Sequence, residues 1–148
     1  MYTNSWVVSP TVKNGQMDAF PQLMVEAMVK AVGKYNEKQP DDYQIEYFIN
    51  QKHIKLYGDE KAVYDTFKFS LEPEDDVNGR LGIDSWRFCK TNREPYDKVI
   101  KVFLSLMKQY GLITSWDHGD NSRCPEYQAA RRFAKKLGIE WHGNRPLK

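Results

Sequence analysis

Residues 85–142 most constrain how this chain can fold, because strand-like and helix-like patterns alternate along them. Pro95 and Pro125 suit the first turns of two helices, and Gly111 and Gly138 suit the positions just after their last turns. Apolar runs that are typical of strands precede, separate and follow these helices; they are 85–89, 112–116 and 139–142. We therefore predict a strand-helix-strand-helix-strand half, in which the helices connect parallel strands.

The first of these helices, expected from Pro95 to Tyr110, has an apolar stripe at helical spacing. We expect its apolar side chains to be buried and the polar side chains between them to face solvent. The apolar set is Tyr96, Val99, Ile100, Phe103, Leu106, Met107 and Tyr110, and the polar set is Asp97, Lys98, Lys101, Ser105 and Lys108. Such a helix packs one face on a sheet and leaves the other in water.

The first half of the chain reads mainly as strands. Residues 1–16 read as irregular or as a short extended start, and a helix is expected from about Pro21. Two β-branched and aromatic runs predict a hairpin: 43–50 and 53–58. Residues 66–72 alternate like a further strand. We predict one α+β domain over residues 1–148, a sandwich in which helices pack on a mixed β-sheet with an N-terminal hairpin region.

Composition and cysteine content exclude several protein classes. Apolar residues make up 41% and charged residues 28%, which indicates a globular, soluble chain. We see no signal peptide at the start and no apolar run long enough for a membrane span. Cys89 and Cys124 form neither a CxxC pair nor a disulfide framework, so we expect free thiols and a cytoplasmic location. No phosphate-binding glycine loop or dinucleotide fingerprint is present, so no cofactor is expected.

The polar junction between the first predicted strand and helix of this half is one candidate binding site. Lys90, Thr91 and Arg93 are suited to bind an anion beside the N-terminus of the helix. Glu94 and Asp97, however, already bring negative charge to that end of the helix, where they favour a helix start. The anion site and the simple helix start both remain open.

A second candidate binding site follows the next predicted strand. Asp117, His118 and Asp120 are suited to bind a metal or exchange protons, although their spacing matches no zinc pattern and we predict no metal. The same residue types are ordinary turn formers, which is the alternative explanation. If the two strands are parallel, their C-terminal ends lie at the same end of the sheet, and the two candidate loops form one site there.

Basic residues concentrate near the end of the sequence. Residues 123–148 carry seven Lys or Arg against two Glu, a net of +5, so the remainder of this +2 chain carries −3. Four basic residues of the last predicted helix can attract phosphate: Arg131, Arg132, Lys135 and Lys136. A solvated helix face explains the same charges.

Tyr, His and Lys of the predicted hairpin can stack bases, although any half-buried hairpin alternates in this way.

A longer pattern, F-x-F/C-K-T-x-R/K-x-P-Y-D, matches the chain at Lys90, Thr91, Arg93, Pro95, Tyr96 and Asp97, and Phe88 lies one residue after the position of its first F. An apolar helix, a strand ending in an acidic turn and a helix with paired alanines follow it. This arrangement resembles small uncharacterised proteins of bacteriophages and mobile elements. Trp116 and His118 interrupt the Ser-Asp-Gly step expected in the turn, so the resemblance assigns no ligand there. It covers roughly 50 residues and implies a compact bacterial or viral accessory protein, with no known activity.

The lack of a recognisable catalytic constellation favours a non-enzymatic protein that acts by binding. Our first hypothesis is a phage-type accessory protein that binds a host protein, because aromatic residues, 14% of the chain, suit protein interfaces. The second is an enzyme or a nucleotide- or phosphate-binding protein, with a site formed by the Lys90–Arg93 and Asp117–Asp120 loops. The third is a nucleic-acid binder through the basic helix.

Overall fold

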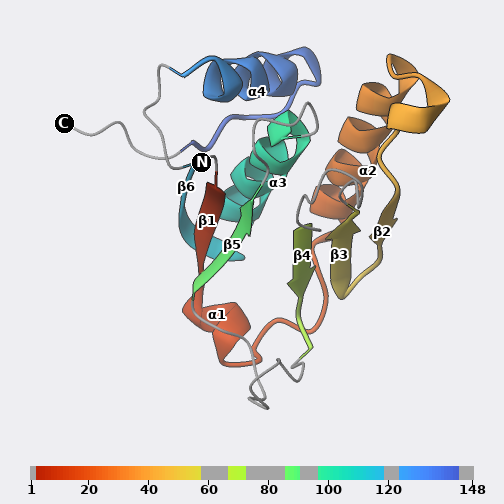
Figure 1. The fold of residues 1–148 in the computed structure, drawn as a ribbon. Coiled ribbons are helices and arrows are strands. Elements are labelled where there is room, and N and C mark those ends of the chain that lie inside the picture. The colour runs from red at the N-terminus through yellow and green to blue at the C-terminus, as the bar shows by residue number, and fades with distance from the viewer. Residues whose placement is uncertain (1–2, 58–66, 73–85, 91–96, 119–123, 144–148) are drawn as a thin grey trace.

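A computed structural model describes residues 3–57, 67–72, 86–90, 97–118 and 124–143, and for 86–90 it describes the backbone only. These residues contain helices and antiparallel sheets, which confirms the predicted α+β class (Figure 1). The strands are β1 Thr3–Val8, β2 Tyr47–Ile49, β3 His53–Leu56, β4 Phe67–Ser70, β5 Trp86–Lys90 and β6 Ile113–Asp117. The helices are α1 Pro10–Lys13, α2 Gln22–Glu37, α3 Asp97–Gln109, α4 Pro125–Lys136 and the 3-10 helix η1 Asp41–Tyr43. None of these described helices is long and apolar enough to span a membrane.

β1 is the central strand of the first sheet, whose order is β5-β1-β6. Both neighbours pair antiparallel to it, with Thr3 opposite Lys90 and Ser5 opposite Asp117. β5 and β6 therefore run parallel to each other, on either side of β1. The predicted direct pairing of these two strands is wrong, because β1 lies between them. β1 comes from the segment that the sequence predicts as irregular or as a short extended start.

The chain after α4 forms no strand at 139–142, contrary to the prediction. Side chains of α3 and β6 hold it instead. Ser105 Oγ donates to the Glu140 carbonyl (3.3 Å) and accepts from the His142 amide (2.8 Å). Trp116 Nε1 donates to the His142 carbonyl (2.9 Å). These bonds satisfy backbone groups that would otherwise need a neighbouring strand, so the apolar segment packs without joining a sheet.

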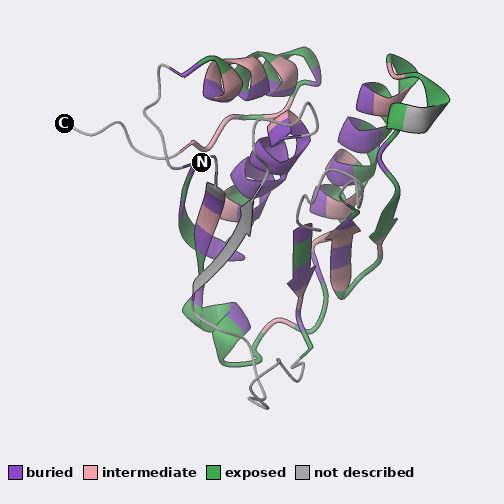
Figure 2. Ribbon diagram, in the orientation of Figure 1, coloured by how far each residue is buried: buried purple, intermediate pink, exposed green. Residues whose placement is uncertain are grey.

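α3 is the central helix and is buried on almost every side (Figure 2). Because α2, α4 and β6 pack against it, all residues from Val99 to Met107 are buried. The predicted solvent-facing stripe is therefore wrong for Asp97, Lys101 and Ser105, which are buried as well. Each of these polar side chains is hydrogen-bonded within the fold, and this compensates for the loss of water.

The second sheet, β2-β3-β4, is antiparallel and contributes to the same core. Its β2-β3 hairpin agrees with the predicted one, and Tyr47 lies opposite Leu56. The Phe67 ring of β4 lies 5.0 Å from the Trp6 ring of β1 and 6.2 Å from the Phe103 ring of α3. Aromatic packing on α3 therefore joins the two sheets into one core.

Candidate functional site

Both candidate loops leave the first sheet at the same end. Lys90 and Asp117, the last residues of β5 and β6, lie opposite Thr3 and Ser5 near the start of β1. β1 separates the two strands, so their backbones lie about 10 Å apart, twice the usual spacing of neighbouring strands. A site shared by the two candidate loops requires that both strands end at the same end of the sheet, and β5 and β6 do so.

The structure describes the side chains of two of the six candidate binding residues. Asp117 is exposed at the end of β6, whereas His118 is buried and turned toward the core. The other four side chains fall outside the described ones: Lys90, Thr91, Arg93 and Asp120. No group of three or more metal-ligating side chains occurs within the described ranges. A shared site at this end of the sheet therefore stays a prediction.

His118 belongs to a buried cluster with Tyr127 and Cys124. Its ring lies 4.7 Å from the Tyr127 ring, and its Nδ1 lies 3.6 Å from Cys124 Sγ. Cys124, a thiol rather than half of a disulfide, is the N-cap of α4, and its sulfur accepts the Tyr127 N–H (3.4 Å). A cysteine sulfur beside an imidazole is the pairing that nucleophilic cysteines use. Because both side chains are buried, the pair has the chemistry of a nucleophile without access for a substrate.

The N-cap role of Cys124 predicts how two substitutions differ. Cys124→Ser keeps an acceptor for the Tyr127 amide, whereas Cys124→Ala removes it. Serine is among the best N-cap residues and alanine among the worst, so we expect Cys124→Ala to be about 1 kcal/mol less stable than Cys124→Ser. Urea unfolding of both variants measures the difference. Equal stability would show that the sulfur only fills space.

A second buried polar cluster joins β1 to α3 near the same end of the sheet. Asp97 Oδ1 accepts from Asn4 Nδ2 (2.7 Å), and Asp97 Oδ2 is bound by Lys101 Nζ. Asp97 and Lys101 are each only 2% exposed. A buried ion pair of this kind offsets its loss of water only if both partners are present and further hydrogen bonds are made. The sequence patterns missed this cluster because both residues look like solvent-facing helix positions.

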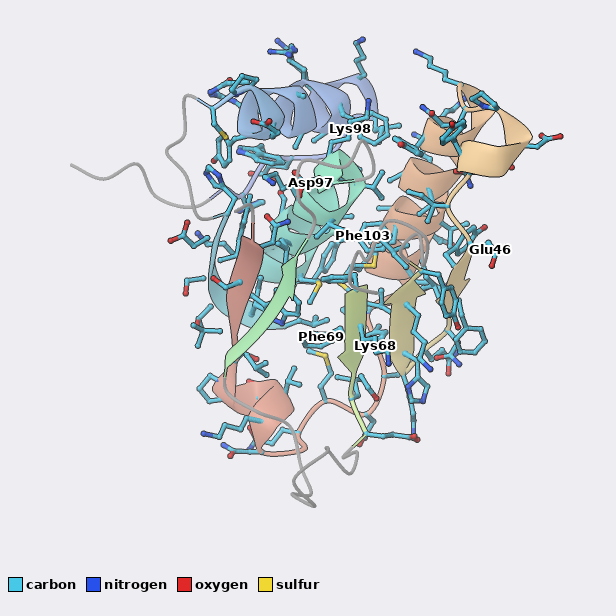
Figure 3. The ribbon with its side chains drawn as sticks, in the orientation of Figure 1. Glu46, Lys68, Phe69, Asp97, Lys98 and Phe103 are labelled. Carbon is cyan, nitrogen blue, oxygen red and sulfur yellow. The ribbon has the colours of Figure 1, made fainter. Side chains whose placement is uncertain are left out.

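The basic helix that the sequence predicts as a nucleic-acid surface is α4. Its four candidate side chains are all exposed: Arg131, Arg132, Lys135 and Lys136. Lys98, at the start of α3, lies close by (Figure 3). Its Nζ is 5.2 Å from the Phe133 ring of α4 and 5.4 Å from the Tyr35 ring of α2. Positive charge from α3 therefore adds to the basic surface of α4.

Burial of its ammonium group lowers the pKa of Lys98 below the ordinary 10.5, and repulsion from Lys38 and Lys136 lowers it further. Between the lowered pKa and 10.5, the unfolded chain binds more protons than the folded one. The free energy of unfolding should therefore rise with pH in this window. We expect the wild-type chain to gain stability relative to Lys98→Met as the pH is raised from neutral through the window. Denaturant unfolding of wild type and Lys98→Met over this pH range tests the expectation. A stability difference that stays constant or falls as the pH rises would contradict it.

The exposed aromatic side chains among the described residues come from η1, from β2 and from the residue that follows β3. These are Tyr43, 71% exposed, Tyr47, 41%, Phe48, 48%, and Tyr57, 44%. We call these four residues the β2 aromatic surface. Tyr47 and Phe48 are neighbours in a strand, so their side chains point to opposite faces of the sheet. The surface therefore wraps around the outer edge of β2.

No protein-family model matches the chain, and no curated protein or solved structure matches it significantly. The resemblance to bacteriophage and mobile-element proteins stays a prediction.

Proposed function

We propose that the chain binds a protein partner, an extended segment of which adds to the edge of β2. The β2 aromatic surface is the observation that carries this proposal. Two of its exposed rings, Tyr47 and Phe48, lie on an edge strand, and a third, Tyr57, belongs to a residue whose amide bonds to the Glu46 carbonyl just before that strand. Tyr and Phe are enriched at protein interfaces, and exposed apolar side chains that gather in one place often mark an interaction site. A partner segment along β2 would cover Tyr47 on one face and Phe48 on the other.

The backbone of β2 offers hydrogen-bonding groups for such a segment. The Glu46 carbonyl accepts from Tyr57 (2.9 Å) and the Asn50 amide donates to His53 (3.0 Å), so even-numbered residues bond to β3. In an antiparallel pair the bonding direction alternates, so Tyr47 and Ile49 direct their N–H and C=O groups away from β3. In the described part of the chain, no strand pairs with this edge. An added strand would satisfy these groups, as in other cases of strand addition.

The outer face of this sheet favours an acidic partner segment. Lys55 of β3 lies directly opposite Lys68 of β4, and Phe48 lies opposite Lys55. Like charges in directly opposed positions destabilise a sheet. Neither lysine forms an ion pair with a carboxylate among the described residues. Glu72, a carboxylate of the same sheet region, is paired with Lys52 and His53 instead. Carboxylates of a partner would relieve this repulsion.

Selection of random linear peptides against the whole chain tests the proposal. We expect the selected peptides to be acidic and apolar in alternation, and to lose affinity for Tyr47→Ser and Phe48→Ser. Val7→Thr, a change at an exposed apolar residue of the other sheet, is the matched control and should bind like wild type. Selected peptides that bind all three variants equally would contradict the proposal, as would a selection without binders.

The enzyme hypothesis has less support, because the reactive pair found in the described residues, His118 and Cys124, is buried. The identity of the partner as a host protein, the phage-type role and the cytoplasmic location remain proposals.

A further inference from the structure

The Lys98 ammonium lies where three helices meet. Lys98 is the second residue of α3, and its Nζ lies between the Tyr35 ring of α2 and the Phe133 ring of α4. Figure 3 shows it at the upper end of α3, between α2 and α4. The two rings face the ammonium and hold it in place through cation–π contacts. This fixes a positive charge at one point between the helices.

Two further lysines follow from the same two helices. Lys38 comes three residues after Tyr35, and Lys136 comes three residues after Phe133. Residues three apart are neighbours on a helix surface, so each lysine lies beside a ring that contacts Lys98. Their repulsion also contributes to the lowered pKa of Lys98, which agrees with this placement. We call Lys38, Lys98 and Lys136 the three-lysine site.

Helix ends explain two of these lysines but not the third. Lys38 and Lys136 lie at the C-terminal ends of α2 and α4, where the helix dipole favours a cation. Lys98 lies in the first turn of α3, at the positive end, where the dipole disfavours a cation and favours an anion. None of the three forms an ion pair with a carboxylate within the described residues, and the adjacent Asp97 is bound by Lys101. In this part of the chain, three neighbouring lysines therefore leave an excess of positive charge that one bound anion could neutralise.

We propose that the three-lysine site binds a phosphate group. A phosphate would neutralise the repulsion, and its oxygens can accept from several ammonium groups at once. The phosphate would come from a free polyphosphate or nucleotide, or from a nucleic-acid backbone extending along Arg132 and Lys135 of α4. This site is separate from the β2 aromatic surface and does not rest on the proposed function.

Isothermal titration with tripolyphosphate at low salt tests the site, with fluorescence anisotropy of labelled single- and double-stranded DNA as the second arm. We expect wild-type binding that falls about tenfold or more in Lys98→Gln, because a charge-assisted hydrogen bond is lost. Lys34→Gln is the matched control, since Lys34 is an exposed lysine of α2 already paired with Glu37 (3.6 Å). Binding to tripolyphosphate supports a free phosphate ligand, and binding to DNA alone supports the backbone.

Proton linkage gives a readout that nonspecific attraction would not produce. A bound phosphate stabilises the charged form of Lys98, so binding at alkaline pH should take up protons in wild type and not in Lys98→Gln. Should Lys98→Gln fail to fold, Lys38→Gln, at an exposed position, replaces it for the affinity measurement. The proposal is overturned if neither probe binds wild type, or if Lys34→Gln weakens binding as much as the site variants. Tyr47→Ser should leave phosphate binding unchanged, so this proposal and the proposed function can fail separately.

Discussion

Lys101→Met is expected to lower the free energy of unfolding by about 3–5 kcal/mol, although a lysine on a helix would ordinarily be a tolerant site. The reason is that the Asp97 carboxyl group, only 2% exposed, would lose the cation that Lys101 supplies and would find no water to replace it. A single uncompensated ion in a protein interior costs far more than the lost contacts alone. Urea unfolding followed by circular dichroism measures the change.

The double variant Asp97→Asn with Lys101→Met separates charge from packing. The new amide side chain would carry no charge but would still offer an oxygen to Asn4 Nδ2, which in the wild-type chain donates to Asp97. We expect the double variant to be more stable than Lys101→Met alone by at least about 1 kcal/mol. Lys34→Met, at an exposed position of α2, should change stability by less than about 0.5 kcal/mol. If the separate costs of Asp97→Asn and Lys101→Met simply add in the double variant, no stabilising ion pair exists there.

Tyr47→Ser is expected to weaken binding of a selected peptide about 30-fold or more. Interface residues of this type that contact a partner closely commonly cost about 2 kcal/mol or more when truncated, which corresponds to about 30-fold. Surface plasmon resonance with the peptide immobilised measures the ratio, and Val7→Thr should remain within about twofold of wild type. An equal loss of peptide affinity in Tyr47→Ser and Val7→Thr would indicate that both variants fold poorly, which a melting curve identifies.

Periodicity predicted the helices and the hairpin well, because these features depend on neighbours in the sequence. α4 begins at Pro125, as expected from the proline, and the hairpin joins β2 to β3. Such local rules succeed where a single element decides the environment.

The errors arose where a distant partner decides the environment. Asp97 and Asn4 are 93 positions apart in sequence, yet their hydrogen bond is part of what makes burial of Asp97 possible. The Lys98 position likewise depends on how α2 and α4 pack on α3, and helical spacing within α3 says nothing about this. β1 begins with the polar residues Thr3–Ser5, which do not show the apolar pattern of a central strand, although the Asn4 side chain is buried. Spacing along the sequence therefore did not predict which polar side chains the fold buries.

The most direct test of the proposed strand addition is amide hydrogen exchange by NMR, in the uncomplexed chain and with a selected peptide bound. The amides of Tyr47 and Ile49 point away from β3, so in the uncomplexed chain they should exchange quickly and in the complex at least about tenfold more slowly. Phe48, whose amide faces β3, should change less and serves as the internal reference. Unchanged exchange at Tyr47 and Ile49, with new protection confined to α4 or to the first sheet, would contradict binding at the edge of β2.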